Sequence, residues 1–456
     1  MRFILNPPAW HLIYKTTNNV IIGQEKLNTI MHTDLVLVIN CGSSSLKFAL
    51  YHTRQTKLHS EQTKRHSEQI PTYHQQKILA EGLAESLNQD TAKIQIKCNG
   101  KKQQFELKVS DVDENSHTIA LQYILQSLEK QFNLKQNLIG IGHRVVHGGN
   151  LFKYSTQVDD HVLDQIKACT PLAPLHNPAN ISGIETLQNA YPKTPQVAVF
   201  DTAFHQSMPA KAFTYALPYA LYKDEHVRRY GFHGISHRYI TIQAAHHFDK
   251  STSDINIVTA HLGNGASVSA IKNGLSVDTS MGMTPLEGLV MGTRCGDLDP
   301  GIFDYLITKD YSPEQISNML NKQSGLLGIS GISNDMRTIC EQAEKGHEAA
   351  QLALDVFCFR AAKHIAAMTV SLTSIDAIIF TGGIGENSAQ VRHQITEQLG
   401  LLGFSIDANL NKALKAVDDK KPGSEIQSES SRPILVIPTD EESLIVQDTL
   451  DIIHSA

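Results

Sequence analysis

The feature that most constrains the fold is a strand–turn–strand unit in which two apolar runs are joined by a turn of small residues. Residues 36–51 (VLVINCGSSSLKFALY) contain two such runs around Gly-Ser-Ser-Ser, and the lengths of the runs suit the strands of a hairpin. Residues 255–274 (INIVTAHLGNGASVSAIKNG) repeat this arrangement around a Gly-Asn-Gly turn. Because one unit opens each half of the chain, the sequence predicts a duplicated core.

Strands and helices alternate along the rest of the chain, which is typical of α/β architecture. Asn99-Gly100 is a hairpin turn signal between two apolar runs over 92–109. Polar connections are expected over 53–77 and 411–431. The remaining expected elements are helices over 116–132 and 345–373, strands that end in turns over 138–149, 194–205 and 375–388, and a strand, an acidic turn and a closing helix over 432–453.

Length and composition indicate an ordinary globular protein of a reducing compartment. The 456 residues suffice for two sizeable domains, and the net charge of −6 provides no basic field for nucleic acid or an anionic membrane surface. The six cysteines form no Cys-x-x-Cys pair, which argues against a disulfide framework and a Cys-rich zinc site. No apolar run approaches the ~18–20 residues that a membrane helix needs. We therefore expect a cytoplasmic protein.

Three turns of small residues lie at strand ends, and together they indicate a nucleotide phosphate site. They are the Gly-Ser-Ser-Ser turn that begins at Gly42, the turn in 261–267 (HLGNGAS) and the turn in 380–388 (FTGGIGENS). Small residues let backbone N–H groups approach an anion closely. None of the three matches a Walker loop or a dinucleotide fingerprint. Lys47 would add a positive charge beside the first turn, and the alternative is a tight hairpin with a solvent-facing lysine.

An ordered set of motifs resembles the acetate kinase family from about residue 34 to the C-terminus. The motifs are VLVINCGSSSLKF, GHRVVHGG, PLAPLHNPANISGI, FDTAFH, YGFHGISH, HLGNGAS, MGMTPLEGLVMGTRCGDLDP, SNDMR and FTGGIGEN. Their collinear order is far more specific than any single motif. The departures are residues 1–33, which the family pattern lacks, and Cys295, where Ser is expected. Neither departure removes a charged group.

The resemblance implies an α/β protein with two ribonuclease-H-like domains of the actin-like ATPase fold and an active-site cleft between them. We expect a first, acyl-substrate domain over 34–202 plus 443–456 and a second, nucleotide-binding domain over 203–442. Residues 1–33 lack the basic and apolar regions of a secretory signal. They are expected to be a dispensable, disordered extension, and an ordered surface arm is the alternative.

The same resemblance implies reversible phosphoryl transfer from ATP to acetate, giving acetyl phosphate and ADP. It implies Mg²⁺, with Mn²⁺ as the alternative, and a cytoplasmic homodimer that binds neither nucleic acid nor a membrane. A propionate or butyrate kinase of the same family is one alternative, because one methylene is worth only ~1–3 kcal/mol. An ATPase related to actin and the heat-shock chaperones, which would phosphorylate no acid, is the other.

The chemistry of this transfer explains which side chains the resemblance singles out. Two anions must meet, so the site has to cancel charge, and the acceptor carboxylate needs no strong base at neutral pH. By resemblance, Arg144 holds the acetate carboxylate and Arg294 stabilises the phosphoryl group in transfer, although a surface ion pair is the alternative for any single arginine. His233 would donate to the phosphoryl oxygens with His176 in support. Asp201 would orient Arg144 or the water shell of the metal, or act on the substrate.

The metal and nucleotide residues are also carried over by resemblance. Asn40 and Glu441 are linked to magnesium, with Glu442 as the adjacent competitor, and Lys47 faces the nucleotide phosphates. Val146, Leu175 and Pro285 are expected to line the acyl pocket. The other implied nucleotide-binding residues are His261, Leu262, Gly263, Asn264 and Gly265 at the β- and γ-phosphates, and Asp335, Met336, Arg337, Gly383, Ile384, Gly385, Glu386 and Asn387 beside adenosine and ribose.

Overall fold

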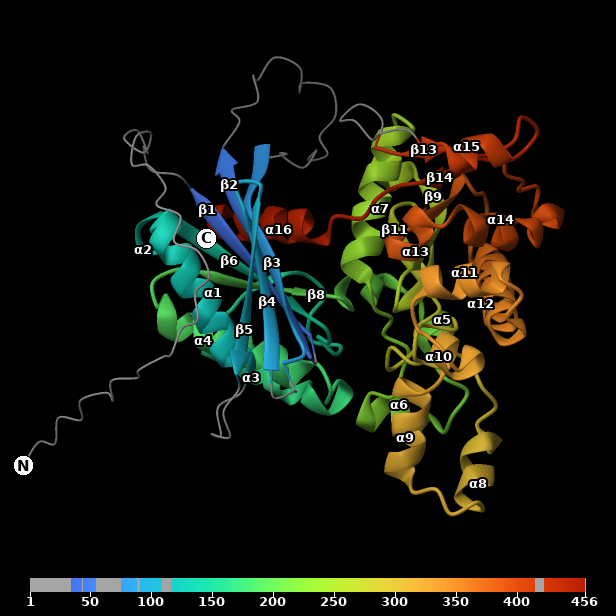
Figure 1. Ribbon diagram of the computed structural model, residues 1–456, viewed down its shortest axis with the longest axis horizontal. Coiled ribbons are helices and arrows are strands. Elements are labelled where there is room, and N and C mark those ends of the chain that lie inside the picture. The colour runs from blue at the N-terminus through green and yellow to red at the C-terminus, as the bar shows by residue number, and fades with distance from the viewer. Residues whose placement is uncertain are drawn as a thin grey trace, which may run out of the picture. The chain divides into compact units, whose positions relative to one another are not determined.

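The computed structural model describes residues 34–42, 44–54, 75–87, 91–108, 116–414 and 422–455 (Figure 1). The extension predicted at 1–33 lies outside the described residues. So do most of the connection predicted over 53–77 and the middle of the connection predicted over 411–431.

A mixed sheet carries the first half of the chain, and its described strands run in the order β5-β4-β3-β2-β1-β6-β8-β7. The central strand β1 pairs antiparallel with β2 and parallel with β6, which in turn pairs parallel with β8. The strands are β1 Leu35–Cys41, β2 Ser45–Arg54, β3 Gln75–Glu85, β4 Thr91–Cys98, β5 Lys101–Lys108, β6 Leu138–Val145, β7 Thr156–Gln157 and β8 Gln196–Phe200.

The second half carries a sheet with the same core connectivity, in the order β11-β10-β9-β12-β14-β13. Its central strand β9 pairs antiparallel with β10 and parallel with β12, which pairs parallel with β14. The duplicated core expected from the two strand–turn–strand units is therefore present. The strands are β9 Asn256–Leu262, β10 Ala266–Lys272, β11 Leu275–Thr279, β12 Ala377–Thr381, β13 Ser424–Glu425 and β14 Ile434–Val436.

Helices cover both faces of each sheet, as Figure 1 shows for α1 and α16 on the first and α7 and α12 on the second. The α-helices are α1 Ser116–Phe132, α2 Leu134–Asn137, α3 Asp160–Ala168, α4 Asn177–Ala190, α5 Ala210–Phe213, α6 Tyr219–Glu225, α7 Gly234–His247, α8 Gly301–Ile307, α9 Pro313–Lys322, α10 Gly325–Ser330, α11 Met336–Glu344, α12 Glu348–Met368, α13 Gly382–Asn387, α14 Ala389–Glu397, α15 Ala408–Lys412 and α16 Glu441–Ser455.

Two of these helices connect the halves, because each follows the last parallel strand of one sheet and packs on the other. Helix α7 comes after β8, yet its Ile240 and Ala244 pack with Ile257 and Ile379 of the second sheet. Helix α16 comes after β14, yet its Leu444, Ile445 and Leu450 pack with valines of the first sheet. The N-terminus of α16 is thereby brought back to the strands that open the chain.

Two glycines of β6 allow α16 to lie close to the first sheet. A Cβ atom on Gly142 would stand 2.5 Å from Cγ2 of Ile445 and 2.6 Å from Oγ1 of Thr449, distances that real Cβ contacts do not reach. A Cβ atom on Gly140 would meet Thr449 and Ile453 at 3.0 and 3.2 Å. The missing side chains therefore set the height of α16 above the sheet.

Local sequence accounts for several elements and misses others. Asn99 and Gly100 both adopt positive φ, at 49° and 75°, as the turn of a two-residue hairpin requires. Strand β3 was not expected, because its first residues continue the polar composition of the preceding segment. The glycines at 382 and 383 were expected in a turn, but they already belong to α13, because Gly382 can adopt a φ of 77° against the backbone of Leu262.

Candidate active site

Three of the predicted site residues lie side by side across the first sheet. Asn40 on β1 pairs with Lys47 on β2 and with Arg144 on β6, so all three side chains point to one face. That face is covered by α16, whose first residues are Glu441 and Glu442. The cationic and acidic motifs at opposite ends of the sequence therefore meet here.

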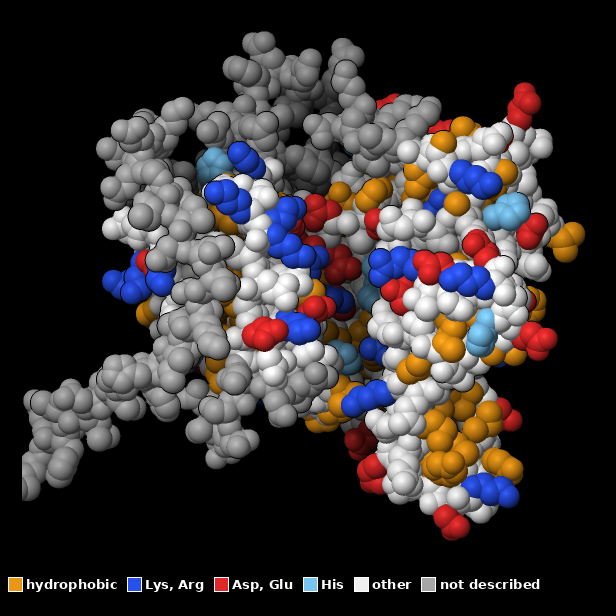
Figure 2. Space-filling view, in the orientation of Figure 1, with side chains coloured by type: hydrophobic (Ala, Val, Ile, Leu, Met, Phe, Trp, Pro, Cys, Tyr) orange, Lys and Arg blue, Asp and Glu red, His pale blue; other side chains and the backbone are white. Residues whose placement is uncertain are grey.

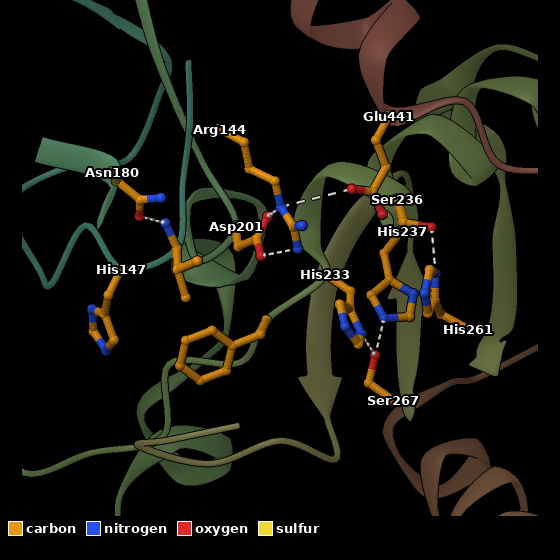
Figure 3. Close-up of polar contacts among 12 residues, drawn as sticks. Arg144, His147, Asn180, Asp201, His233, Ser236, His237, His261, Ser267 and Glu441 are labelled. Carbon is orange, nitrogen blue, oxygen red and sulfur yellow. Dashed lines mark hydrogen bonds and ion pairs between the residues drawn. The ribbon is translucent and has the colours of Figure 1, made fainter. Parts of the chain in front are cut away.

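Arg144 is held between two carboxylates (Figure 3). Its Nε donates to Oδ1 of Asp201 at 2.9 Å and its Nη2 to Oδ2 at 2.6 Å, a bidentate pair. Glu441 Oε2 lies 3.7 Å from Nε on the other side. Burial alone would lower the pKa of Arg144, but Asp201 and Glu441 raise it above its ordinary value. The arginine is therefore a fixed, permanently charged group.

Glu441 and Glu442, which sequence alone separated weakly, occupy different positions. Glu442 forms an ion pair with Lys47, with 2.5 Å between Oε1 and Nζ. Glu441 instead faces Arg144 and Asp201, and burial raises its pKa to about 7, with Asp201 and Glu442 adding to the increase. Glu441 is thus the carboxylate nearer the predicted substrate arginine.

Negative charge is in excess around this corner of the described chain. Asp201, Asp440, Glu441 and Glu442 surround Arg144 and Lys47, and burial raises the pKa of Asp440 as well as that of Glu441. Asn40 adds a neutral amide on the same sheet face. Among the described residues, no group of three or more His, Cys, Asp or Glu side chains is placed to bind a metal ion by itself. An oxygen-rich, incompletely neutralised site of this kind fits a divalent cation that keeps several waters.

The second half contributes histidines from α7 and β9. His233 precedes α7 in the left-handed conformation, with φ of 56°, and its ring stacks on His261 with centroids 4.3 Å apart. Nδ1 of His233 lies 2.9 Å from Oγ of Ser267, and Oγ of Ser236 lies 2.8 Å from Nδ1 of His261. Burial, followed by neighbouring cations, lowers the pKa of His233 well below its ordinary value, so its ring is neutral.

Arg294 lies near His233, beside Gly265, and has no carboxylate partner among the described residues. Its Nη1 donates to the carbonyl of Pro285 at 3.2 Å, and burial lowers its pKa. A Cβ atom on Gly265 would stand 3.3 Å from Nε2 of His233 and 3.9 Å from Nη1 of Arg294. The glycine turn therefore lets both donors approach one point.

The two predicted arginines act on the same imidazoles. After burial, Arg294 and Arg144 lower the pKa of His176, which is about 4, and both also lower the pKa of His233. His176 precedes α4 in the first half, whereas His233 precedes α7. Figure 2 shows the surface hollowed between the two halves, with charged side chains on the floor of the hollow. The two arginines thus converge with both histidines.

A pocket of about 880 Å³ brings together the three segments expected to bind the nucleotide beyond the first turn. Its walls come from the turn after β9, the start of α11, and the α13–α14 region. The predicted residues that line it are Gly263, Asn264, Asp335, Met336, Arg337, Gly383, Ile384 and Asn387, and Cys340 and Asn334 join them.

Several other predicted nucleotide-binding residues do not line this pocket. Leu262 is buried in the core of the second sheet, and Gly385 is buried within α13. His261 faces His233, as described above. Oε1 of Glu386 accepts from the backbone N–H groups of Gly382 and Thr439 at 2.9 and 3.1 Å, so this carboxylate ties α13 to the segment before α16.

The apolar residues expected to line the acyl pocket lie in different surroundings. Val146 is buried and belongs to the same apolar cluster as Phe232. Leu175 is 52% exposed and lines a separate pocket with residues of α9. Phe232 was missed, and its position directly before His233 was the only signal available. Ser236 and Ser267 lie within the quoted motifs YGFHGISH and HLGNGAS, but nothing in the sequence showed that they contact His261 and His233.

The duplicated sheets, the glycine-lined pocket and the clustered arginines and histidines define the class of the protein, a phosphotransferase with the actin-like ATPase fold. A family model described as the acetokinase family matches residues 35–447. The chain belongs to that family.

Relatives and solved structures agree with this assignment. An acetate kinase of Shewanella amazonensis is 48% identical over 426 residues, covering 93% of this chain and all of the relative. A propionate kinase structure from Francisella tularensis has a TM-score of 0.80 at 42% identity, and an acetate kinase structure from Porphyromonas gingivalis has 0.78 at 37%. Each alignment covers 92% of this chain and 99% of the solved one.

These findings confirm the predicted fold class and the predicted activity, that of a kinase that uses ATP to phosphorylate a small carboxylic acid. Among the described residues, no helix is both long and apolar enough to cross a membrane. The domain boundaries and the roles of individual site residues remain predictions.

Proposed function

We propose that this enzyme transfers the γ-phosphoryl group of ATP to acetate in the region between Arg144 and Arg294. The observation that supports this most strongly is that Nε2 of His233 and Nη1 of Arg294 approach one point beside Gly265, and both arginines also lower the pKa of His176 and of His233. Two permanent cations can lower the repulsion between a carboxylate and a polyphosphate.

Arg144 would bind the acceptor carboxylate, because it is fixed by Asp201 and its Nη1 contacts no carboxylate among the described residues. Asp201 would hold the guanidinium in place. Arg294 and His233 would contact the phosphoryl oxygens during transfer, and His176 would support them. The neutral ring of His233 can donate one hydrogen bond without attracting a proton from solvent.

The nucleotide would lie in the pocket between α11, α13 and the turn after β9. The backbone N–H group of Asn264 can approach phosphate oxygens, since neither neighbouring glycine carries a Cβ; the N–H group of Gly263 donates to the carbonyl of Gly265 at 3.0 Å and shapes the turn. Lys47 would break its ion pair with Glu442 and bind the phosphates instead. Val146 and Phe232, both buried in the same apolar cluster, would contact the acyl chain.

Mg²⁺ would be held by Asn40 and Glu441 through oxygen ligands and water, with Mn²⁺ as a substitute. The excess of carboxylates at this corner supports the assignment, because a dication would relieve it. When bound, the metal would neutralise phosphate charge.

A homodimer in the cytoplasm is the proposed state of the enzyme. Helix α8 has no buried residue among its described positions and presents an apolar surface, visible in Figure 2 over the lower part of the second half. We call Ile302, Phe303, Tyr305, Ile307 and Tyr311 the α8 patch; each is 37–60% exposed. A second copy covering this patch would remove apolar area from water. Sedimentation of an Ile302→Lys, Tyr305→Lys variant as monomer supports this, and an unchanged dimer contradicts it.

An acid panel tests the proposed function. Purified enzyme, ATP and Mg²⁺ are incubated with hydroxylamine and acetate, propionate or butyrate, and acyl hydroxamate is measured. We expect hydroxamate only when an acid is present, with the highest kcat/KM for acetate. A clear preference for propionate or butyrate would overturn the acetate assignment, and ATP hydrolysis independent of any acid would favour an ATPase.

A further inference from the structure

Behind His233 lies a series of buried hydrogen bonds that links it to Thr259 through Ser267 and His237. Oγ1 of Thr259 on β9 lies 2.6 Å from Nδ1 of His237, and Nε2 of His237 lies 2.8 Å from Oγ of Ser267 on β10. The same Oγ lies 2.9 Å from Nδ1 of His233 (Figure 3). Thr259, Ser267 and His237 are each 0% exposed.

We infer that Thr259, His237 and Ser267 are positioning residues that fix His233 as the neutral tautomer carrying its proton on Nε2. The inference rests on the proposed function, in which Nε2 of His233 donates to the phosphoryl group. It adds to that function the reason why this nitrogen carries the hydrogen.

The direction in which these hydrogen bonds donate follows from the Thr259 end of the series. Among the described residues, Nδ1 of His237 is the only hydrogen-bond partner of the Thr259 hydroxyl. A buried hydroxyl proton without an acceptor is costly, so Thr259 donates to Nδ1 of His237. A neutral imidazole has one proton, which then lies on Nε2 of His237 and is donated to Ser267.

The remaining steps leave one arrangement at His233. The oxygen of Ser267 accepts from His237, so its own proton is donated to Nδ1 of His233. The proton of His233 is then on Nε2, beside Gly265 and Arg294. In the reverse arrangement, the Thr259 proton has no acceptor and His233 turns a bare lone pair toward the phosphoryl oxygens. The series therefore favours the donor form.

The rings of His233 and His237 are both neutral, so the tautomer decides which nitrogen of each ring donates. A protonated imidazole would donate from both nitrogens whatever its neighbours. Burial lowers the pKa of His233 and of His237, and cationic or polarisable groups on every side add to this. For His233 these groups are His261, Arg144, His237 and Arg294, and for His237 they are His205 and His261.

Thr259 offers a matched pair of substitutions. Thr259→Val keeps the shape and removes the hydroxyl, whereas Thr259→Ser keeps the hydroxyl and removes the methyl group. We expect kcat to fall about 10-fold or more in Thr259→Val, by the usual effect of outer-shell partners, with the KM values for ATP and acetate changed less than about threefold. Thr259→Ser should retain most of the parent kcat.

Thr241→Val controls for the loss of a buried threonine hydroxyl. Thr241 is 1% exposed and donates to the backbone carbonyl of His237 at 2.7 Å, with no contact to a ring nitrogen. This variant should lose stability but keep kcat. If Thr259→Ser lowers kcat as much as Thr259→Val, packing rather than the hydroxyl is responsible and the inference fails.

A direct readout is ¹⁵N NMR of enzyme labelled in its histidine rings, without substrates. Comparison with a His233→Gln variant assigns the His233 signals, and the expected pattern is a protonated Nε2 and an unprotonated Nδ1. Thr259→Val and Ser267→Ala should weaken that pattern in favour of the other tautomer. A protonated Nδ1 in the parent enzyme would overturn the inference. Because this measurement needs no turnover, its result is independent of the acid panel, in which failure of the proposed function would be seen.

Discussion

Arg144 illustrates how single residues define this site. Its partners come from β8, which ends just before Asp201, and from α16, which begins at Glu441. The motifs around these residues were each readable in the sequence, and the resemblance named the residues as candidates. The resemblance gave contact of Asp201 with Arg144 as one of several alternatives, and local patterns could not decide among them, because 57 residues separate the two and the N-terminus of α16 returns only through packing. The contacts of Thr259 with His237 were invisible for the same reason.

At the residue scale, we predict that Asp201→Asn lowers kcat/KM for acetate about 10²-fold while the KM for ATP changes little. The substitution removes one charge from a buried pair and leaves Arg144 free to turn toward Glu441, which costs several times the energy of an exposed pair. Initial rates at varied acetate and varied ATP separate the two effects. A selective rise in the KM for ATP would contradict the role of Asp201 in holding the acetate-binding arginine.

At the element scale, the position of α16 connects the sheet to the chemistry. Sequence patterns predicted the closing helix and both strand–turn–strand units, because apolar runs and small-residue turns are local signals. They did not predict that Gly140 and Gly142 face α16, since a glycine in a strand gives no indication of which element packs against it. The long helix expected over 345–373 is α12, shortened to Glu348–Met368, because the chain continues as a single 3₁₀ turn at Thr369.

Gly142→Ala should lift α16 from the sheet, because its Cβ would meet Ile445 and Thr449 at less than 3 Å. We expect a loss of about 1–3 kcal/mol in the free energy of unfolding, as for overpacked cores, and reduced activity as Glu441 moves. Gly140→Ala, whose closest contact would be 3.0 Å, is the milder control. Urea unfolding and initial rates measure both. Equal effects of the two variants would argue against close packing at Gly142 as the cause.

At the scale of the whole molecule, a set of buried neutral histidines predicts sensitivity to acid. Burial lowers the pKa to about 4, from an ordinary value of 6.5, in His143, His147, His176, His205 and His261. Below pH 6.5 the unfolded chain binds protons that the folded chain does not. Stability is therefore lost as pH falls from about 6.5 toward 4.

Each such histidine lowers the free energy of unfolding by roughly 1.4 kcal/mol per pH unit once pH is well inside that window. Glu441, whose pKa is raised to about 7, and Asp440, whose pKa is also raised, act in the opposite direction, but they are two groups against these five histidines, to which His233 and His237 add. Urea unfolding at pH 7.5 and pH 5.5 should show a clear drop in midpoint at the lower pH. A midpoint that stays constant or rises would show that these rings accept protons in the folded state.

The most direct test of the central claim compares Arg144→Ala, Arg294→Ala and the double variant with the parent in acetyl phosphate formation. If both guanidinium groups serve one transfer, each single variant should lose about 10²–10³-fold in kcat/KM, as for removal of a preorganised electrostatic group. The double variant should then lose far less than the product of the two, because either loss already disables the shared step. Independent, multiplicative losses, or a single variant with parent activity, would contradict the account.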